Sequence, residues 1–170
     1  MTAALTPNPV SPPAADTAAE TTFRSLIRTF GVLDRVMSPY FLRFGISGAQ
    51  WGVLRTLQRA EADGSPALRV TELSERLLIR PPSVTGVVDR LVRDGLVKRE
   101  SLPSDLRVKQ ISLTAKGRQR VHDVLNVHGG QVAKVLSGLT LPEQVELGRL
   151  LDRLREHLGE MAEGSVEENT

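Results

Sequence analysis

Lysine and arginine side chains, which can hold phosphate groups, are concentrated in the middle of the chain. Residues 80–120 carry ten of them against four acidic residues, a net charge of +6. Residues 140–170 carry eight acidic residues against three arginines, a net charge of −5. The net charge of the whole protein is only +2. The asymmetry therefore favours a polyanionic partner for the centre of the chain.

The histidines and serines offer no spacing typical of catalysis or of metal binding. His122, His128 and His157 do not follow the i, i+4 pattern that places two ligands on one helix face, and no cysteine can join them. Ser83 has no partner His or Asp at an informative spacing, so phosphate contact explains it better than nucleophilic catalysis. We expect no enzymatic activity and no cofactor. A metal-responsive regulator that uses His and Glu ligands stays open as an alternative.

The composition is that of a globular domain built mainly from helices. The 170 residues are 40% hydrophobic and 25% charged, and aromatic residues make up only 4%, so the core must consist largely of Leu, Val and Ala. The absence of cysteine excludes disulfides and fits a cytoplasmic protein. No apolar run approaches the roughly 18 residues of a membrane span, and the N-terminus does not resemble a secretory signal.

The basic region begins with two short helices separated by a break. Thr71 can cap the first helix, and Leu73 and Leu77 are expected to face inward. The sequence RPPS at 80–83 breaks it, because a residue before proline avoids the helical region. The second helix is expected to start near Pro82 and to end at Arg93 or Asp94, with a glycine as its C-terminal stop.

The second helix has two different faces. Its apolar residues recur at helical spacing and should form a buried stripe: Val84, Val87, Val88 and Leu91. The remaining positions carry short polar groups first and two arginines later: Ser83, Thr85, Gly86, Asp89, Arg90 and Arg93. Short residues allow the backbone to approach base edges, and Arg can bind guanine or phosphate in a bidentate manner. The alternative is an ordinary solvated helix face.

Two predicted strands follow, at 96–100 and 108–113, with turn residues at 101–105 between them. A helix pair followed by such a hairpin, or wing, is typical of DNA-binding winged helices. Arg107 near the tip could enter a minor groove, where the negative potential is strong. Asp105 is predicted to pair with Arg107 and to orient it. The alternative is a surface ion pair that contributes little.

Helices are predicted on both sides of this region. An amphipathic helix limited by Pro39 precedes it, and Ser47 with Gln50 forms a capping-box pattern for the next helix. Thr114 and Thr140 can cap two later helices, the first of which should be weakened or bent by a Gly-Gly pair at 129–130. The expected organisation is a flexible N-terminal arm, an N-terminal dimerisation helix, a DNA-binding lobe, C-terminal dimerisation helices and an acidic, frayed tail, at 1–19, 20–46, 47–114, 115–160 and 161–170.

The segments TELSERL, PPSVTGVVDRLVRDGLVKRE, DLRVK and ISLT-AKG resemble, in order and spacing, those of the MarR family of winged-helix transcriptional regulators. The resemblance covers about residues 20–160, and the D-x-R wing followed by L-T-x-x-G is its most specific part. The chain departs from the pattern at Gly86, where many relatives carry a longer polar or basic side chain. It also departs at Leu106, where a charged residue is frequent.

The resemblance implies a mainly α fold with a small β-wing, and a homodimer formed by interlocking N- and C-terminal helices. It also implies a repressor that binds palindromic double-stranded promoter DNA and is released by a small aromatic or phenolic ligand. The rival is a winged-helix module that binds protein and has no ligand response. The expected DNA-binding residues are Arg80, Ser83, Thr85, Gly86, Arg90, Arg93, Lys98, Asp105, Arg107 and Lys109. The expected ligand-binding residues are Tyr40, Arg43 and Trp51, although Trp51 also fits the core.

Overall fold

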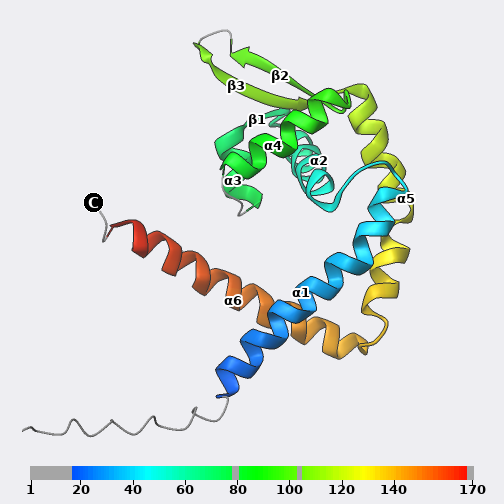
Figure 1. The fold of residues 1–170 in the computed structure, drawn as a ribbon, viewed down its shortest axis with the longest axis vertical. Helices are drawn as coiled ribbons and strands as arrows, with labels where there is room; N and C mark the ends of the chain where they lie inside the picture. Colours follow the sequence, from blue (N-terminus) through cyan, green and yellow to red (C-terminus); the bar gives the residue numbers. More distant parts are fainter. Residues whose placement is uncertain (1–16, 78–80, 103–104, 168–170) are drawn as a thin grey trace, which may run out of the picture. The chain divides into compact units, whose positions relative to one another are not determined.

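The computed structural model describes residues 17–77, 81–102 and 105–167, and the side chains of 17–77, 82–101 and 108–162. Within these ranges the chain forms six helices and a three-stranded sheet (Figure 1). It divides into two compact units, and the division falls inside α5, between Val121 and His122. Most of the predicted N-terminal arm and the last three residues of the predicted tail lie outside the described residues.

Helix α1 spans Ala18–Leu42, and Thr17 caps it by accepting a hydrogen bond from the Glu20 backbone N–H at 3.2 Å. The prediction that Pro39 limits this helix was wrong, because Pro39 lies inside it. Proline removes one backbone N–H donor. However, the two residues that follow, Tyr40 and Phe41, are buried, and this packing favours continuation of the helix for another turn.

Helix α2 spans Gly48–Ala62 and starts with the predicted capping box. Ser47 Oγ accepts from the Gln50 N–H at 3.2 Å, and Gln50 Oε1 accepts from the Ser47 N–H at 2.9 Å. The inner face of α2 supplies much of the core of the first unit: Trp51, Val53, Leu54, Leu57 and Ala60 are all buried.

Strands β1 (Ala67–Arg69), β2 (Val97–Leu102) and β3 (Asp105–Leu113) form an antiparallel sheet in the order β1-β3-β2. Leu68 pairs with Ile111 at one edge of β3, and Arg99 pairs with Ile111 at the other. Strands β2 and β3 extend beyond β1 as the predicted wing (Figure 1). Both are longer than expected and take in residues assigned to the turn.

The predicted helix pair is present as α3 (Val70–Leu77) and α4 (Pro81–Arg93). Helix α3 starts one residue before Thr71, and the Glu72 side chain accepts from the Arg69 backbone N–H. All four residues of the predicted inner stripe of α4 are buried: Val84, Val87, Val88 and Leu91. The helix stops at a left-handed Gly95 (φ 69°), where the Leu96 N–H reaches back to the Leu91 carbonyl.

Helices α5 (Ala115–Leu136) and α6 (Leu141–Glu167) complete the chain. Helix α5 continues through the Gly-Gly pair at 129–130. Helix α6 runs well past residue 160, so the prediction of a frayed segment there was wrong for residues 161–167. Within the described residues, no helix is long and apolar enough to cross a membrane.

Candidate nucleic-acid interface

Helix α4 presents a polar face opposite its buried stripe. Ser83, Gly86, Arg90 and Arg93 follow one another at steps of three and four residues, so they lie along one side of the helix. We call these four residues the reading face. Three of their side chains are exposed, and Gly86 is half-exposed with nothing within 4 Å of the position of an added Cβ. Within the described residues neither arginine forms an ion pair, so both guanidinium groups are available for phosphates or base edges.

The turn that ends α4 is fixed by hydrogen bonds from two other helices. Gln50 Nε2 of α2 donates to Asp94 Oδ2 at 3.1 Å, and Lys116 Nζ of α5 donates to the Asp94 carbonyl at 2.8 Å. Thr114 Oγ1 donates to the Gly95 carbonyl at 2.7 Å and accepts from the Gly117 N–H at 3.0 Å. These bonds hold the C-terminal end of the reading face relative to the rest of the lobe.

Gly117 lets α5 come this close to the turn. A Cβ at this position would lie 2.0 Å from the Leu96 carbonyl oxygen and 3.0 Å from the Leu96 carbonyl carbon. Both are backbone atoms, which cannot rotate away. This contact explains why a glycine stands three residues after Thr114 in the L-T-x-x-G pattern.

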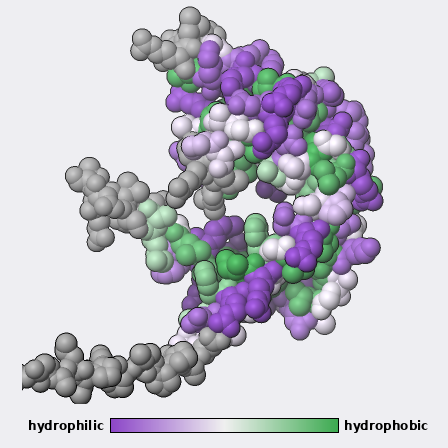
Figure 2. Space-filling model, in the orientation of Figure 1, coloured by the Kyte–Doolittle hydropathy of each residue, from purple (hydrophilic) through white to green (hydrophobic). Residues whose placement is uncertain are grey.

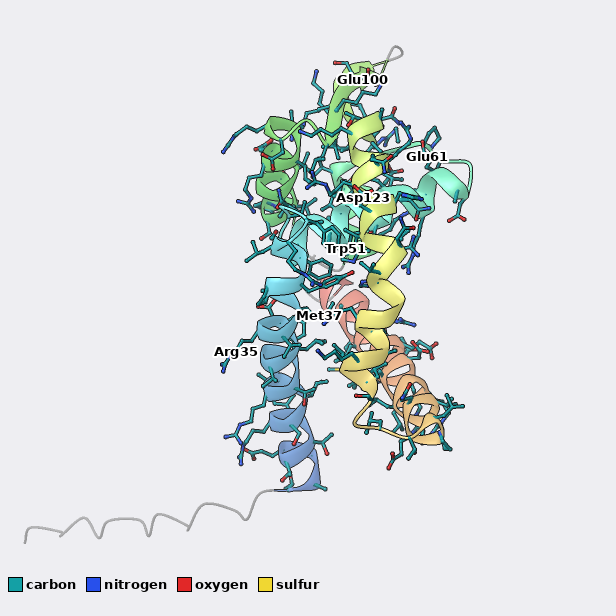
Figure 3. The ribbon with its side chains drawn as sticks, turned by 90° about the vertical axis from the view of Figure 1, so that its right-hand side faces the viewer. Arg35, Met37, Trp51, Glu61, Glu100 and Asp123 are labelled. Atoms are coloured by element: carbon teal, nitrogen blue, oxygen red, sulfur yellow. The ribbon has the colours of Figure 1, made fainter. Side chains whose placement is uncertain are left out.

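The two lysines of the wing, Lys98 and Lys109, contact neighbouring side chains. Lys98 Nζ lies 2.8 Å from Glu100 Oε2, and Lys109 Nζ donates to Ser101 Oγ at 2.5 Å on the paired strand. Both lysines are exposed, and Figure 3 shows Glu100 on the outer part of the wing. Exposed contacts of this kind contribute little to stability, so they leave the lysines free to exchange partners.

Several predicted DNA-binding residues cannot be placed in full. Arg80 lies outside the described residues. Asp105 and Arg107 belong to β3, but their side chains, and therefore their predicted pairing, lie outside the described part of the chain. Thr85 lies within α4, and its side chain is half-buried.

Sequence reasoning counted Arg99 and Lys116 as basic charge without giving either a place at the interface. Arg99 Nη2 lies 2.7 Å from Asp89 Oδ1 and so joins β2 to α4. The alternation of side chains along a strand could have indicated this contact. Arg99 lies on the same face of β2 as the buried Val97, whereas Lys98 lies on the opposite face. The role of Lys116 depends on the fold of a distant turn, and local pattern carries no signal for it.

The predicted ligand-binding residues Tyr40 of α1 and Trp51 of α2 both contact the Phe41 ring and form an aromatic cluster with it. Figure 3 labels Trp51. The Phe41 ring lies 5.1 Å from the Tyr40 ring and 5.8 Å from the Trp51 ring, centroid to centroid. Tyr40 and Trp51 are buried, whereas Arg43 is exposed and places its guanidinium 5.1 Å from the centre of the Tyr40 ring. Burial raises the pKa of the Tyr40 phenol despite the opposing charge of Arg43.

A metal site is not apparent in the described part of the chain, which contains no group of three His, Asp or Glu arranged to hold an ion. The three-stranded sheet, the helix pair and the exposed arginines of α4 together define a winged-helix protein of the DNA-binding class.

Known proteins place the chain within that class. A sequence profile of the MarR family matches residues 44–107. The HTH-type transcriptional repressor YetL of Bacillus subtilis is 30% identical over 136 residues, which cover 80% of each chain. The repressor MdtR of the same organism is 33% identical over 76% of this chain and 81% of its own. The chain belongs to the MarR family and is a DNA-binding transcriptional regulator.

Solved structures agree with this assignment. A mutant of MarR from E. coli, complexed with operator DNA, matches with a TM-score of 0.71 and 25% identity, over 79% of this chain and 93% of that one. BpsR of Bordetella bronchiseptica also has a TM-score of 0.71, at 22% identity over 80% of this chain and 99% of its own. The second match shows the shared fold alone.

Proposed function

We propose that the chain acts as a homodimeric repressor that binds a palindromic promoter site and is released by a small aromatic or phenolic anion. The observation that carries the DNA part is the reading face, which exposes two arginines without an ion pair among the described residues, beside a basic wing. One such face covers only part of a turn of DNA. A dimer would place two of them in successive major grooves about one helical turn apart.

Exposed apolar side chains support the dimer. In α1, Phe23 and Phe30 are 65% and 71% exposed, and in α6 Leu150 and Leu158 are 47% and 51% exposed. In Figure 2 hydrophobic residues, in green, lie at the surface over α6, whereas hydrophilic residues cover most of the visible lobe. A monomer rarely leaves large contiguous apolar surfaces in water, so a second copy is the occupant that we propose.

The role of the wing is tested by titrating the protein, at several salt concentrations, with a duplex that the wild-type protein has selected from a random library. Arg107→Ala is expected to weaken binding and to reduce the slope of log K against log salt by about one unit per arginine and half-site. Unchanged affinity and slope would contradict a role for the wing. Sedimentation of the free protein at micromolar concentration should give a dimer, and a monomer would contradict the proposed assembly.

The ligand part rests on the charge of Arg43 beside the Tyr40 ring. A carboxylate could pair with the exposed guanidinium while its ring packs near the aromatic cluster. DNA binding of BpsR is regulated by 6-hydroxynicotinic acid, so hydroxylated aromatic acids are suitable probes. Thermal-shift screening should find stabilising compounds whose effect is lost in Arg43→Ala. Equal shifts in both proteins would place the ligand elsewhere.

A further inference from the structure

The ion pair between Asp89 and Arg99 joins the two parts of the molecule that must meet DNA together. Asp89 belongs to α4, three residues after Gly86 and one before Arg90, so it stands at the edge of the reading face. Arg99 belongs to β2, the first strand of the wing. The 2.7 Å contact between Arg99 Nη2 and Asp89 Oδ1 therefore bridges the recognition helix and the wing.

This pair differs from its neighbour on the wing. Lys98 and Glu100 are two residues apart on the same strand and pair across 2.8 Å, so their contact connects no separate elements. Arg99 lies on the opposite face of β2, with the buried Val97. Each pair joins a basic and an acidic side chain, but Arg99 is 33% exposed against 51% for Lys98, and only the Asp89–Arg99 pair spans two elements.

Stability alone gives a weak reason for an acidic residue at this place. The side chains of Arg99 and Asp89 are 33% and 50% exposed, and an exposed pair contributes little to folding. A carboxylate beside the reading face also repels phosphates, which weakens binding to any DNA sequence. By holding Arg99, the same carboxylate keeps one more guanidinium from binding phosphates indiscriminately.

We propose that Asp89 and Arg99 are specificity-determining residues: their pair positions the recognition helix against the wing and restrains sequence-independent binding. The inference deepens the proposed function, on which it rests. At the selected DNA sequence the recognition helix and the wing can bind at the same time in the arrangement that the pair fixes. At other sequences they cannot. Breaking the pair therefore costs more affinity at the correct site than elsewhere.

The test compares the dissociation constants for a duplex that the wild-type protein has selected from a random library and for a scrambled duplex of equal length. The specificity ratio is the constant for the scrambled duplex divided by the constant for the selected duplex. Asp89→Asn and Arg99→Gln should each lower this ratio by about fivefold per half-site. Asp89→Asn should also tighten binding to the scrambled duplex and steepen its salt dependence by about one unit per half-site, because Arg99 is released. Arg99→Gln should do neither.

Glu100→Gln is the matched control, since it releases Lys98 from a pair that lies within one strand and should leave the specificity ratio unchanged. The double variant of Asp89 and Arg99 should lose no more specificity than either single variant, because both changes break one contact. Circular dichroism and thermal unfolding confirm that each variant is folded.

Three results would overturn the inference: a wild-type ratio in Asp89→Asn, additive losses in the double variant, or an equal loss in Glu100→Gln. If the wild-type protein itself binds both duplexes equally, the proposed function fails and the inference fails with it. If the wild-type protein discriminates and the Asp89 variant does so equally well, only the inference fails.

Discussion

The winged-helix lobe and the long helices α1 and α6 differ in how far they bury their apolar side chains. In the lobe, Leu54, Leu73 and Leu91 are fully buried within one chain. Along α1 and α6, side chains of the same kind, such as Phe30 and Leu154, remain 71% and 38% exposed. The lobe thus completes its own core, whereas each of the two helices leaves large apolar side chains exposed to water. Folding of the lobe and assembly of the protein should therefore respond to different substitutions.

The largest effect is expected from Phe30→Glu, which places a charge on the exposed apolar stripe of α1. In a two-fold interface the change occurs twice, and losing about 2 kcal/mol of apolar burial at each copy weakens dimerisation by about a thousandfold. The lobe should stay folded, because Phe30 takes no part in its core. Sedimentation equilibrium measures the dimer constant, and far-UV circular dichroism reports the fold.

Thr21→Glu is the control for Phe30→Glu. It adds the same charge to α1 nine residues earlier, about two and a half turns away and hence on the opposite side of the helix. It should leave the dimer constant nearly unchanged. If both variants dissociate equally, charge on α1 matters rather than the apolar stripe. If neither variant dissociates, the apolar stripe of α1 does not lie in the dimer interface.

Gly117→Ala should destabilise the winged-helix lobe itself. The new Cβ would meet the Leu96 carbonyl oxygen at 2.0 Å, so α5 must move away from the turn that ends α4. A loss of about 3 kcal/mol in the free energy of unfolding is expected. Urea unfolding of the free protein measures it. Gly86→Ala has open space and should instead stabilise α4 by about 1 kcal/mol, and a similar loss in both variants would contradict the steric argument.

The parts that could be predicted are those fixed by residues close in sequence. The capping box of Ser47 and Gln50, the buried valine stripe of α4 and the glycine stop at Gly95 all depend on one or two helical turns. Local rules failed at Pro39, where packing of the next two residues outweighed the preference of proline for a helix end. They also failed at the end of α6, where polar composition suggested fraying but the helix continues.

The parts that could not be predicted depend on residues distant in sequence. Lys116 reaches the Asp94 carbonyl, and Gln50 reaches the Asp94 side chain across 44 positions. No pattern in either segment indicates its partner. The reading face could be predicted from helical spacing, but the contacts that orient it could not, because they exist only after α2, α4 and α5 have packed together.

Gln50→Leu should also destabilise the lobe, because it removes a buried polar link between helices. The variant loses the hydrogen bonds of the Gln50 amide to the Ser47 N–H and to Asp94 Oδ2. Loss of about 1.5 kcal/mol in unfolding free energy is expected, with the dimer constant unchanged. Thermal unfolding and sedimentation measure the two quantities. Asp94→Asn keeps an acceptor for Gln50 and should cost less; a larger loss there would show that the Asp94 charge matters instead.

The smallest effect concerns Glu61 at the far end of α2, which accepts three hydrogen bonds of 2.6–3.0 Å from Arg118 of α5. These bonds hold the pKa of the Glu61 carboxyl below its ordinary value of 4.5. Because the pKa is lower in the folded state, the stabilisation is complete above pH 4.5 and disappears as pH falls through the folded pKa. Both side chains are partly exposed, so Glu61→Gln should lose only about 0.5 kcal/mol at pH 7. Urea unfolding of wild type and variant from pH 7 to pH 3 should show the two stabilities converging, and 1 M salt should narrow the gap at pH 7; a gap that persists at pH 3 would mean that Glu61 acts through packing and not through its charge.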